Sequence, residues 1–223
     1  MKVKKAIALL IVVVLAATLI AGCNGSDGSN KSNGNIAVGD IITFGQYEWR
    51  VLDVQDKKAL LLSEKLIEKR AYNAEFTGIT WEECSLREYL NGEFYNGFDA
   101  EDKALIAETT LANNDNPWEG ASGGNATTDK IFLLSLEEVV RYFGDSGQLK
   151  DRPEGEFLID DNYNSARIAN DESGASWWWL RSPGFDTNLA AYVDKKGFVV
   201  VGGLGVNDGS GGVRPALWMN LES

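Results

Sequence analysis

The chain has 223 residues, of which 44% are apolar, and a formal net charge of −12 at neutral pH. It contains no histidine and only two cysteines, which excludes Ser-His-Asp and Cys-His catalysis and histidine-ligated zinc or iron sites. The acidic balance argues against nucleic acid as a partner, because phosphate binding needs clustered lysine and arginine.

The first 22 residues have the pattern of an export signal. Three lysines at positions 2, 4 and 5 precede an uncharged apolar run from Ala6 to Ala21, which is short for a membrane span. The following Leu19-Ile20-Ala21-Gly22-Cys23 resembles a bacterial lipobox, and the resemblance implies that Cys23 is lipidated and becomes the new N-terminus. We expect residues 1–22 to be a lipoprotein signal peptide, with an uncleaved anchor or ordinary secretion as the alternatives.

Residues 23–35 are expected to comprise the lipidated cysteine and a flexible tether. Residues 24–35 read NGSDGSNKSNGN, without one apolar side chain. A single folded domain is then predicted from Ile36 to Ser223. Cys84 is the only cysteine left in it, so no intramolecular disulfide is expected.

The first part of the domain predicts a meander followed by two helices. Alternation in residues 49–54, a DKK turn and the apolar run 59–62 indicate three short strands. The spacing of Thr80 and Glu83 is that of a capping box, which predicts a helix from Thr80 with Cys84 as a small core residue. Asp99 is expected to begin the second helix, which includes residues 104–106.

Residues 113–129 form a long polar loop with two possible interpretations. Its hard oxygen donors are ligands that calcium prefers. The spacing matches no known calcium loop, however, and Asx-rich loops usually bond their own backbone, so the solvated loop is favoured. The donors are Asn113, Asp115, Asn116 and Asp129.

The middle of the domain predicts one strand and one helix. The apolar run 131–134 is typical of a buried strand. Ser135 and Glu138 form a second capping box, and the helix is expected to stop at Gly144. Residues 145–175 are acidic and predicted to be irregular.

The run SWWWLRS, residues 176–182, raises the question of what three tryptophans are for. On a strand, Trp177 and Trp179 face one way while Trp178 and Leu180 face the other. Because such a strand is apolar on both faces, we expect a covered central strand rather than a ligand-stacking platform. Arg181 shares a face with Trp179, which predicts a cation–π contact between them.

A hairpin and a closing strand are predicted after Pro183-Gly184. The runs 190–193 and 198–201 pair across DKKG, with Gly197 in a left-handed position. Residues 213–218 form the closing strand. Two loops remain, Phe185–Leu189 and Gly202–Gly211, and recognition residues often lie on such loops of a rigid scaffold.

Four motifs carry a family resemblance: TFGQYEW, TDKIFLLS, WWWLRSPG and GGVRPALWMNL. They resemble an uncharacterised bacterial domain family found on exported proteins. The C-terminal third also resembles the C-type lectin-like superfold of formylglycine-generating enzymes. This resemblance implies an α+β fold of short antiparallel strands, two to three helices and long loops.

The chain departs from the enzymes of that superfold. It lacks the late cysteine pair of formylglycine-generating enzymes, the iron-binding histidines of sulfoxide synthases and the calcium-dependent sugar motif of animal lectins. We therefore expect a binding protein without catalysis, metal or cofactor. A hydrolase that uses the acid pairs Glu82/Glu83 or Asp160/Asp161 is the enzymatic alternative.

The sequence thus predicts a lipid-anchored protein on the bacterial cell surface that binds a glycan or a protein. One alternative is a variable protein of a diversity-generating retroelement, which the chain resembles in its lectin-like C-terminal segment, and another is a structural domain without a ligand. In the first alternative, the ligand-binding residues given in the next sentence, apart from Asn188, would be hypervariable. The expected ligand-binding residues are Phe185, Asp186, Thr187, Asn188, Leu189, Tyr192, Leu204, Asn207, Asp208 and Ser210.

Overall fold

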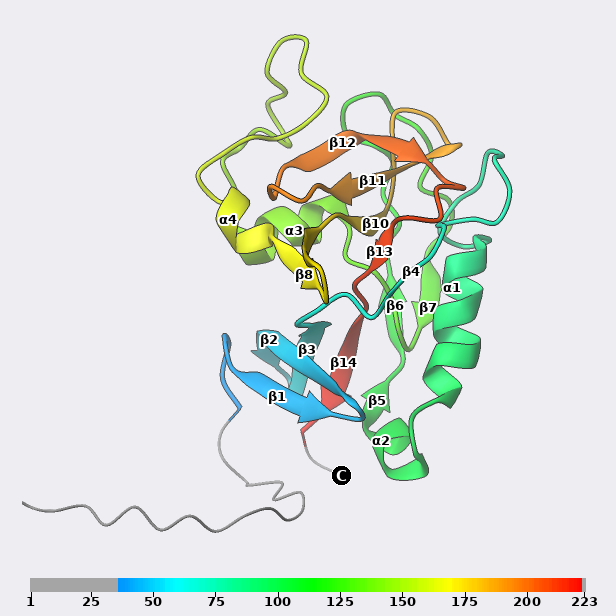
Figure 1. Cartoon of the computed structure of the whole chain (residues 1–223), viewed down its shortest axis with the longest axis vertical. Coiled ribbons are helices and arrows are strands. Elements are labelled where there is room, and N and C mark those ends of the chain that lie inside the picture. The colour runs from blue at the N-terminus through cyan, green and yellow to red at the C-terminus, as the bar shows by residue number, and fades with distance from the viewer. Residues whose placement is uncertain (1–35, 222–223) are drawn as a thin grey trace, which may run out of the picture. The chain divides into compact units, whose positions relative to one another are not determined.

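The computed structural model describes residues 36–221, so the predicted signal peptide, the tether and Cys23 lie outside the described residues. The described residues form one compact unit. Its strands make two five-stranded and two two-stranded sheets, which combine with short helices into an α+β fold (Figure 1). The α+β class is therefore as the sequence predicted.

The first five-stranded sheet contains both ends of the described chain. Its spatial order is β1 (Ile41–Phe44), β2 (Tyr47–Gln55), β3 (Lys58–Ser63), β14 (Ala216–Asn220) and β5 (Ile106–Ala107), and every pair is antiparallel. The predicted meander is confirmed. Asp56 and Lys57 both have positive φ in the β2–β3 turn, as a tight hairpin turn requires.

The second five-stranded sheet contains the tryptophan strand. Its order is β12 (Val199–Gly205), β11 (Leu189–Val193), β10 (Trp178–Pro183), β13 (Gly212–Val213) and β4 (Glu68–Lys69). Only the β10–β13 pair is parallel. The predicted hairpin is confirmed, and Gly197 has a φ of 88° in its turn. Residues 202–205, expected in a loop, instead extend β12.

The closing strand predicted at 213–218 is two strands in two different sheets. The chain leaves β13, passes through Arg214 and Pro215, and continues as β14 (Figure 1). Because Pro215 has no backbone N–H to donate to a strand ladder, the strand is interrupted at this position. Arg214 is buried at the crossing, where its Nε donates to the Ser63 carbonyl at 3.0 Å and its guanidinium lies 5.0 Å from the Trp178 ring. Burial lowers its pKa to about 10, so it stays charged at neutral pH.

The helix predicted from Thr80 begins later. Residues 80–83 form a turn in which the Thr80 carbonyl accepts from the N–H groups of Glu83 and Cys84, at 3.2 and 3.1 Å. The turn is held because the buried Trp81 indole donates to Asp129 at 2.9 Å. Helix α1 (Ser85–Tyr89) follows and continues as the π-helical η1 (Leu90–Phe94). Cys84 is buried, and burial raises the pKa of its thiol to about 12.

Two other helices begin as their caps predicted. Asp99 accepts from the Asp102 N–H ahead of α2 (Ala100–Leu105). Ser135 and Glu138 form the reciprocal capping box of α3 (Leu136–Phe143), which ends at Gly144. The stretch expected to be irregular contains further elements: α4 (Asn164–Arg167), β8 (Ala169–Asp171) and β9 (Gly174–Ser176).

The prediction of a strand at residues 131–134 is wrong. These residues are buried, but only Phe132 forms a bridge, to Ala216. Side chains supply other hydrogen bonds to this segment: Asn91 bonds both backbone groups of Ile131, at 3.2 and 2.9 Å, and Arg181 donates to the Leu133 carbonyl at 2.8 Å. A buried backbone satisfied in this way needs no neighbouring strand.

The tryptophan strand is central and covered, as predicted. Trp178 and Trp179 are fully buried, with ring centroids 6.5 Å from Phe143 and 6.0 Å from Tyr72. Trp177 precedes the strand and is half-buried. The predicted stacking of Arg181 on Trp179 is wrong, because Glu138 of α3 draws the guanidinium to the helix in a two-bond ion pair.

Candidate functional site

Three segments distant in the chain meet to form one surface, which we call the loop face: residues 73–79, 185–189 and 203–210. Their backbones are joined directly. The Thr187 carbonyl accepts from Ile79 at 3.0 Å, the Asn188 carbonyl from Val206 at 3.1 Å, and the Val206 carbonyl from Asn73 at 2.8 Å. The two loops predicted from the sequence are thus adjacent, and a third segment completes the surface.

All ten predicted ligand residues are at least partly accessible. Asp186, Asn207 and Ser210 are exposed, and the other seven are half-buried. Ligand contact requires such accessibility but does not follow from it, so the assignment of these residues to a site stays a prediction.

The structure does not bring the ten residues into a single cluster. The Phe185 ring packs 6.4 Å from the Trp118 ring and 4.8 Å from the Arg152 guanidinium, outside the loop face. Tyr192 lies against the tryptophan strand, with its centroid 5.1 Å from Trp177. Thr187 and Asn188 remain in the loop face through the backbone bonds above.

Two exposed phenylalanines beside β12, one inside the loop face and one outside it, escaped the sequence reasoning. Phe76 is 58% exposed and Phe157 is 52% exposed. A β-carbon at Gly205 would lie 3.4 Å from the Phe76 ring, and one at Gly202 would lie 3.3 Å from the β-carbon of Phe157. Both aromatic residues therefore lie against β12, with the tighter approach at Gly202, and the sequence VGGLG was the available signal.

The acidic side chains of the loop face brace their own turns. Asp186 Oδ1 accepts from the Thr187 N–H at 2.7 Å. Asp208 Oδ1 accepts from the Ser210 N–H at 2.8 Å and from its hydroxyl at 2.6 Å. These bonds from Ser210 lower the pKa of Asp208. Asp208 therefore carries a negative charge in a fixed turn at neutral pH.

Three of the four oxygen donors in the 113–129 loop are engaged within the chain, whereas Asn113 Oδ1 is buried without a hydrogen-bond partner among the described residues. Asn116 Oδ1 accepts from the Trp118 N–H at 2.9 Å. Asn116 is buried, and its amide donates to the carbonyls of Pro183 and Val201, both at 3.0 Å. Asp129 is also buried and accepts from Arg87 at 2.7 Å. Asp115 accepts from the Gly123 N–H at 3.0 Å. The loop is pinned to the tryptophan strand β10 and to β12, which explains its ordered path.

The two acid pairs considered for hydrolysis make structural contacts. Asp161 forms a buried ion pair with Arg167 at 2.9 Å. Burial alone would raise the pKa of Asp161, but hydrogen bonds from Arg167 and Ser146 lower it overall, the wrong direction for a general acid. Glu82 accepts from Asn125 at 2.9 Å.

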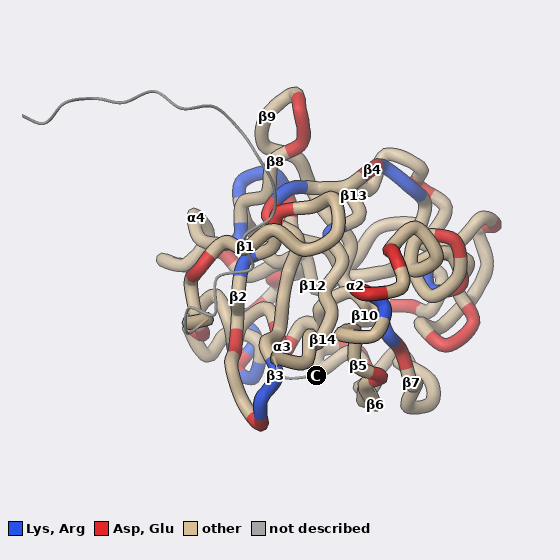
Figure 2. Tube along the Cα trace, turned by 90° about the horizontal axis from the view of Figure 1, so that it is seen from below, with Lys and Arg blue, Asp and Glu red and all other residues tan. Residues whose placement is uncertain are grey.

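The acidic residues of the described chain occur on many connecting loops (Figure 2). Within residues 36–221, no three histidine, cysteine, aspartate or glutamate side chains are grouped as a metal site would require. None of the helices in this range has the length and apolar composition to cross a bilayer.

Of the comparisons with known proteins, only the one with family models gives a match. No curated protein and no solved structure matches the chain. A family model described as a domain of unknown function, DUF6273, matches residues 56–221, and the chain belongs to this family.

Proposed function

We propose that the chain is a lipid-anchored protein of the bacterial cell surface that binds a glycan or a protein through the loop face. The observation that carries the proposal is the exposure of Phe76 and Phe157 beside the glycine-rich strand β12. Few large apolar side chains of the described residues are exposed to this extent, and an exposed aromatic side chain gains most when a partner covers it.

The surroundings of the two rings suit recognition. Braced turns hold Asp186 and Asp208 in the loop face, so polar groups and an exposed aromatic ring share one rigid frame. A C-type lectin-like fold is part of this proposal, and the α+β architecture with long loops supports it. A purely structural domain has no need of exposed phenylalanines at one edge.

The membrane anchor is tested at Cys23. Cys23→Ala should abolish incorporation of a fatty-acid analogue in metabolic labelling, because the cysteine sulfur is the expected attachment atom. Cys84→Ala is the matched control and should leave labelling intact, since that thiol is buried. Label retained on the Cys23 variant would disprove lipidation at this residue.

A double variant tests the loop face. Phe76→Ser with Phe157→Ser should reduce binding of the full chain to a glycan array or to purified cell-surface proteins at least about ten-fold, the effect of losing interface anchors. The control, Ile41→Ser with Val54→Ser, removes two exposed apolar side chains from the other large sheet and should leave binding unchanged. Equal losses in both variants would contradict the proposal.

A variable protein of a retroelement is the second candidate. The accessibility of all ten predicted residues favours it, because residues under diversification must reach a ligand without disturbing the core. The neighbouring DNA decides: a near-copy of codons 176–217 beside a reverse transcriptase supports this candidate, and the lack of both rejects it.

A further inference from the structure

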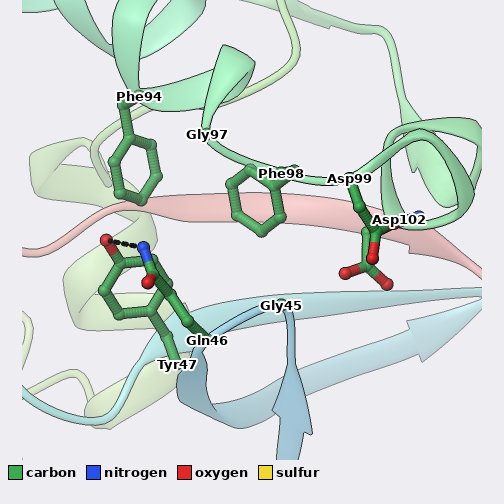
Figure 3. Close-up of a pocket in the computed structure, with 8 residues that line it drawn as sticks. All are labelled: Gly45, Gln46, Tyr47, Phe94, Gly97, Phe98, Asp99 and Asp102. Carbon is green, nitrogen blue, oxygen red and sulfur yellow. Dashed lines mark hydrogen bonds between the residues drawn. The ribbon is translucent and has the colours of Figure 1, made fainter.

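A concave site lies outside the loop face, between the β1–β2 turn and the segment that joins η1 to α2 (Figure 3). The cleft encloses about 260 Å³. This is room for roughly nine water-sized groups, so any ligand is small. The lining residues are Gly45, Gln46, Tyr47, Phe94, Gly97, Phe98, Asp99 and Asp102.

Three aromatic rings form one wall of the cleft. The Tyr47 ring centroid lies 5.5 Å from that of Phe94 and 6.5 Å from that of Phe98, and the two phenylalanines are 5.6 Å apart. Gly45 has a φ of 58°, and a β-carbon there would lie 2.8 Å from the Phe98 ring. Glycine is therefore required for the turn to approach the rings.

Two carboxylates lie at the other end of the cleft, and both point toward the turn at Gly45 (Figure 3). Asp99 is exposed, and its Oδ1 accepts from the Asp102 N–H at 2.8 Å. The carboxylate of Asp102 approaches the turn itself, with Oδ2 3.8 Å from the β-carbon position of Gly45. Asp102 is buried, so the exposed Asp99 supplies the accessible negative charge at this end of the cleft.

The remaining polar groups of the cleft add acceptor capacity. Gln46 Nε2 donates to the Tyr47 hydroxyl oxygen at 2.9 Å, which leaves the amide carbonyl oxygen of Gln46 as an acceptor. None of the eight lining residues is a lysine or an arginine. The cleft therefore combines hydrogen-bond acceptors, negative charge and aromatic faces.

We propose that this cleft binds a small organic ammonium ion. Ammonium N–H groups would donate to the exposed Asp99 carboxylate, and the cation would be attracted to the aromatic faces. The same features disfavour the other ligand classes: an anion is repelled by Asp99, and a neutral apolar molecule would remove this carboxylate from water without compensation.

Three probes that share one carbon skeleton test the charge requirement. Isotope-labelled full chain in detergent would be titrated with 3-methylbutylamine, 3-methylbutanol and 3-methylbutanoate, which are cationic, neutral and anionic at neutral pH. Only the amine should shift the amide resonances of Gly45, Gln46 and Gly97 in a saturable way. Added salt should weaken this binding, since the carboxylate end is accessible.

A pair of variants on one helix tests the carboxylate. Asp99→Asn keeps a good helix cap but removes the charge, and it should raise the Kd of the amine about five- to ten-fold. Glu101→Gln removes the same charge from the same helix outside the cleft and should change the Kd less than about two-fold. Three results would overturn the proposal: no binding of the amine, equal binding of the alcohol, or equal effects of the two substitutions.

Discussion

Strand β10 and the loop face adjoin in the chain, yet they place their aromatic side chains in opposite ways. Trp178 and Trp179 are fully buried, one on each face of the strand. Phe76 and Phe157 are more than half exposed beside β12. Gly184 joins β10 to the loop face, and a β-carbon there would lie 2.5 Å from the Gly202 carbonyl oxygen, so only glycine fits.

The difference shows how this sequence separates stability from recognition. The tryptophan strand contributes buried area and anchors the charged groups of the core, including Arg181 and Arg214. The loop face keeps its shape through backbone bonds and braced turns, so its exposed side chains are not needed for the fold. A sharp contrast in the effects of substitution is therefore expected.

The largest effect is expected at Trp178. Trp178→Ala should reduce the free energy of unfolding by about 3–5 kcal/mol, because it leaves a cavity beside Phe143 and Arg214. Denaturant unfolding measures this loss. Trp177→Ala is the control and should cost clearly less, since Trp177 is only half-buried. Equal losses at the two positions would show that burial does not distinguish them.

The next effect concerns the ion pair between α3 and β10. Glu138→Gln keeps a side chain suited to the capping box but removes the charge that faces buried Arg181. We expect a loss of about 1.5–3 kcal/mol, the contribution of hydrogen bonds to a charged group. Glu137→Gln controls for charge in the same helical turn and should cost about 0.3–1 kcal/mol. An equal loss of stability in Glu137→Gln would mean that the loss in Glu138→Gln comes from removing negative charge at the helix N-terminus and not from the ion pair with Arg181.

A third effect appears only in acid. The pKa of Asp161 is lowered below its ordinary value of 3.8, so the stabilisation from its pair with Arg167 is present above that pH and is lost as the pH falls through the lowered pKa. A carboxyl-carbon NMR titration of the folded chain should place the Asp161 midpoint below 3.8. A midpoint above that value would contradict the hydrogen-bonded pair.

The elements that sequence patterns predicted are those determined locally. The Ser135 capping box and the β2–β3 turn depend on neighbouring residues, and both are as expected. The predictions of a strand at residues 131–134 and of a helix start at Thr80 were wrong. Asn91, Arg181 and Asp129 supply the deciding hydrogen bonds there from distant segments. Apolar runs and cap spacings contain no information on such partners.

The same reason limited the prediction of the candidate sites. The polar and glycine-rich composition of the C-terminal loops predicts that they are accessible, and the predicted ligand residues are at least partly accessible in the structure. The aromatic partners of β12 are Phe76 and Phe157, which come from other parts of the chain. The cleft at Gly45 likewise joins a turn to a helix end about fifty residues away, so only the folded chain reveals it.

The smallest effects on stability are expected for substitutions in the loop face. They would sharpen the contrast between the loop face and the tryptophan strand most. Asn188→Ser and Asn207→Ser should each change the free energy of unfolding by no more than about 0.5 kcal/mol, as surface substitutions usually do. Phe185→Ser should cost about 1–2 kcal/mol, because its half-buried ring packs against Trp118 and Arg152. Thermal and denaturant unfolding of the three variants would distinguish these values. A large loss at Asn188 or Asn207 would mean that the loop face is part of the core, and binding would then have to be sought on another surface.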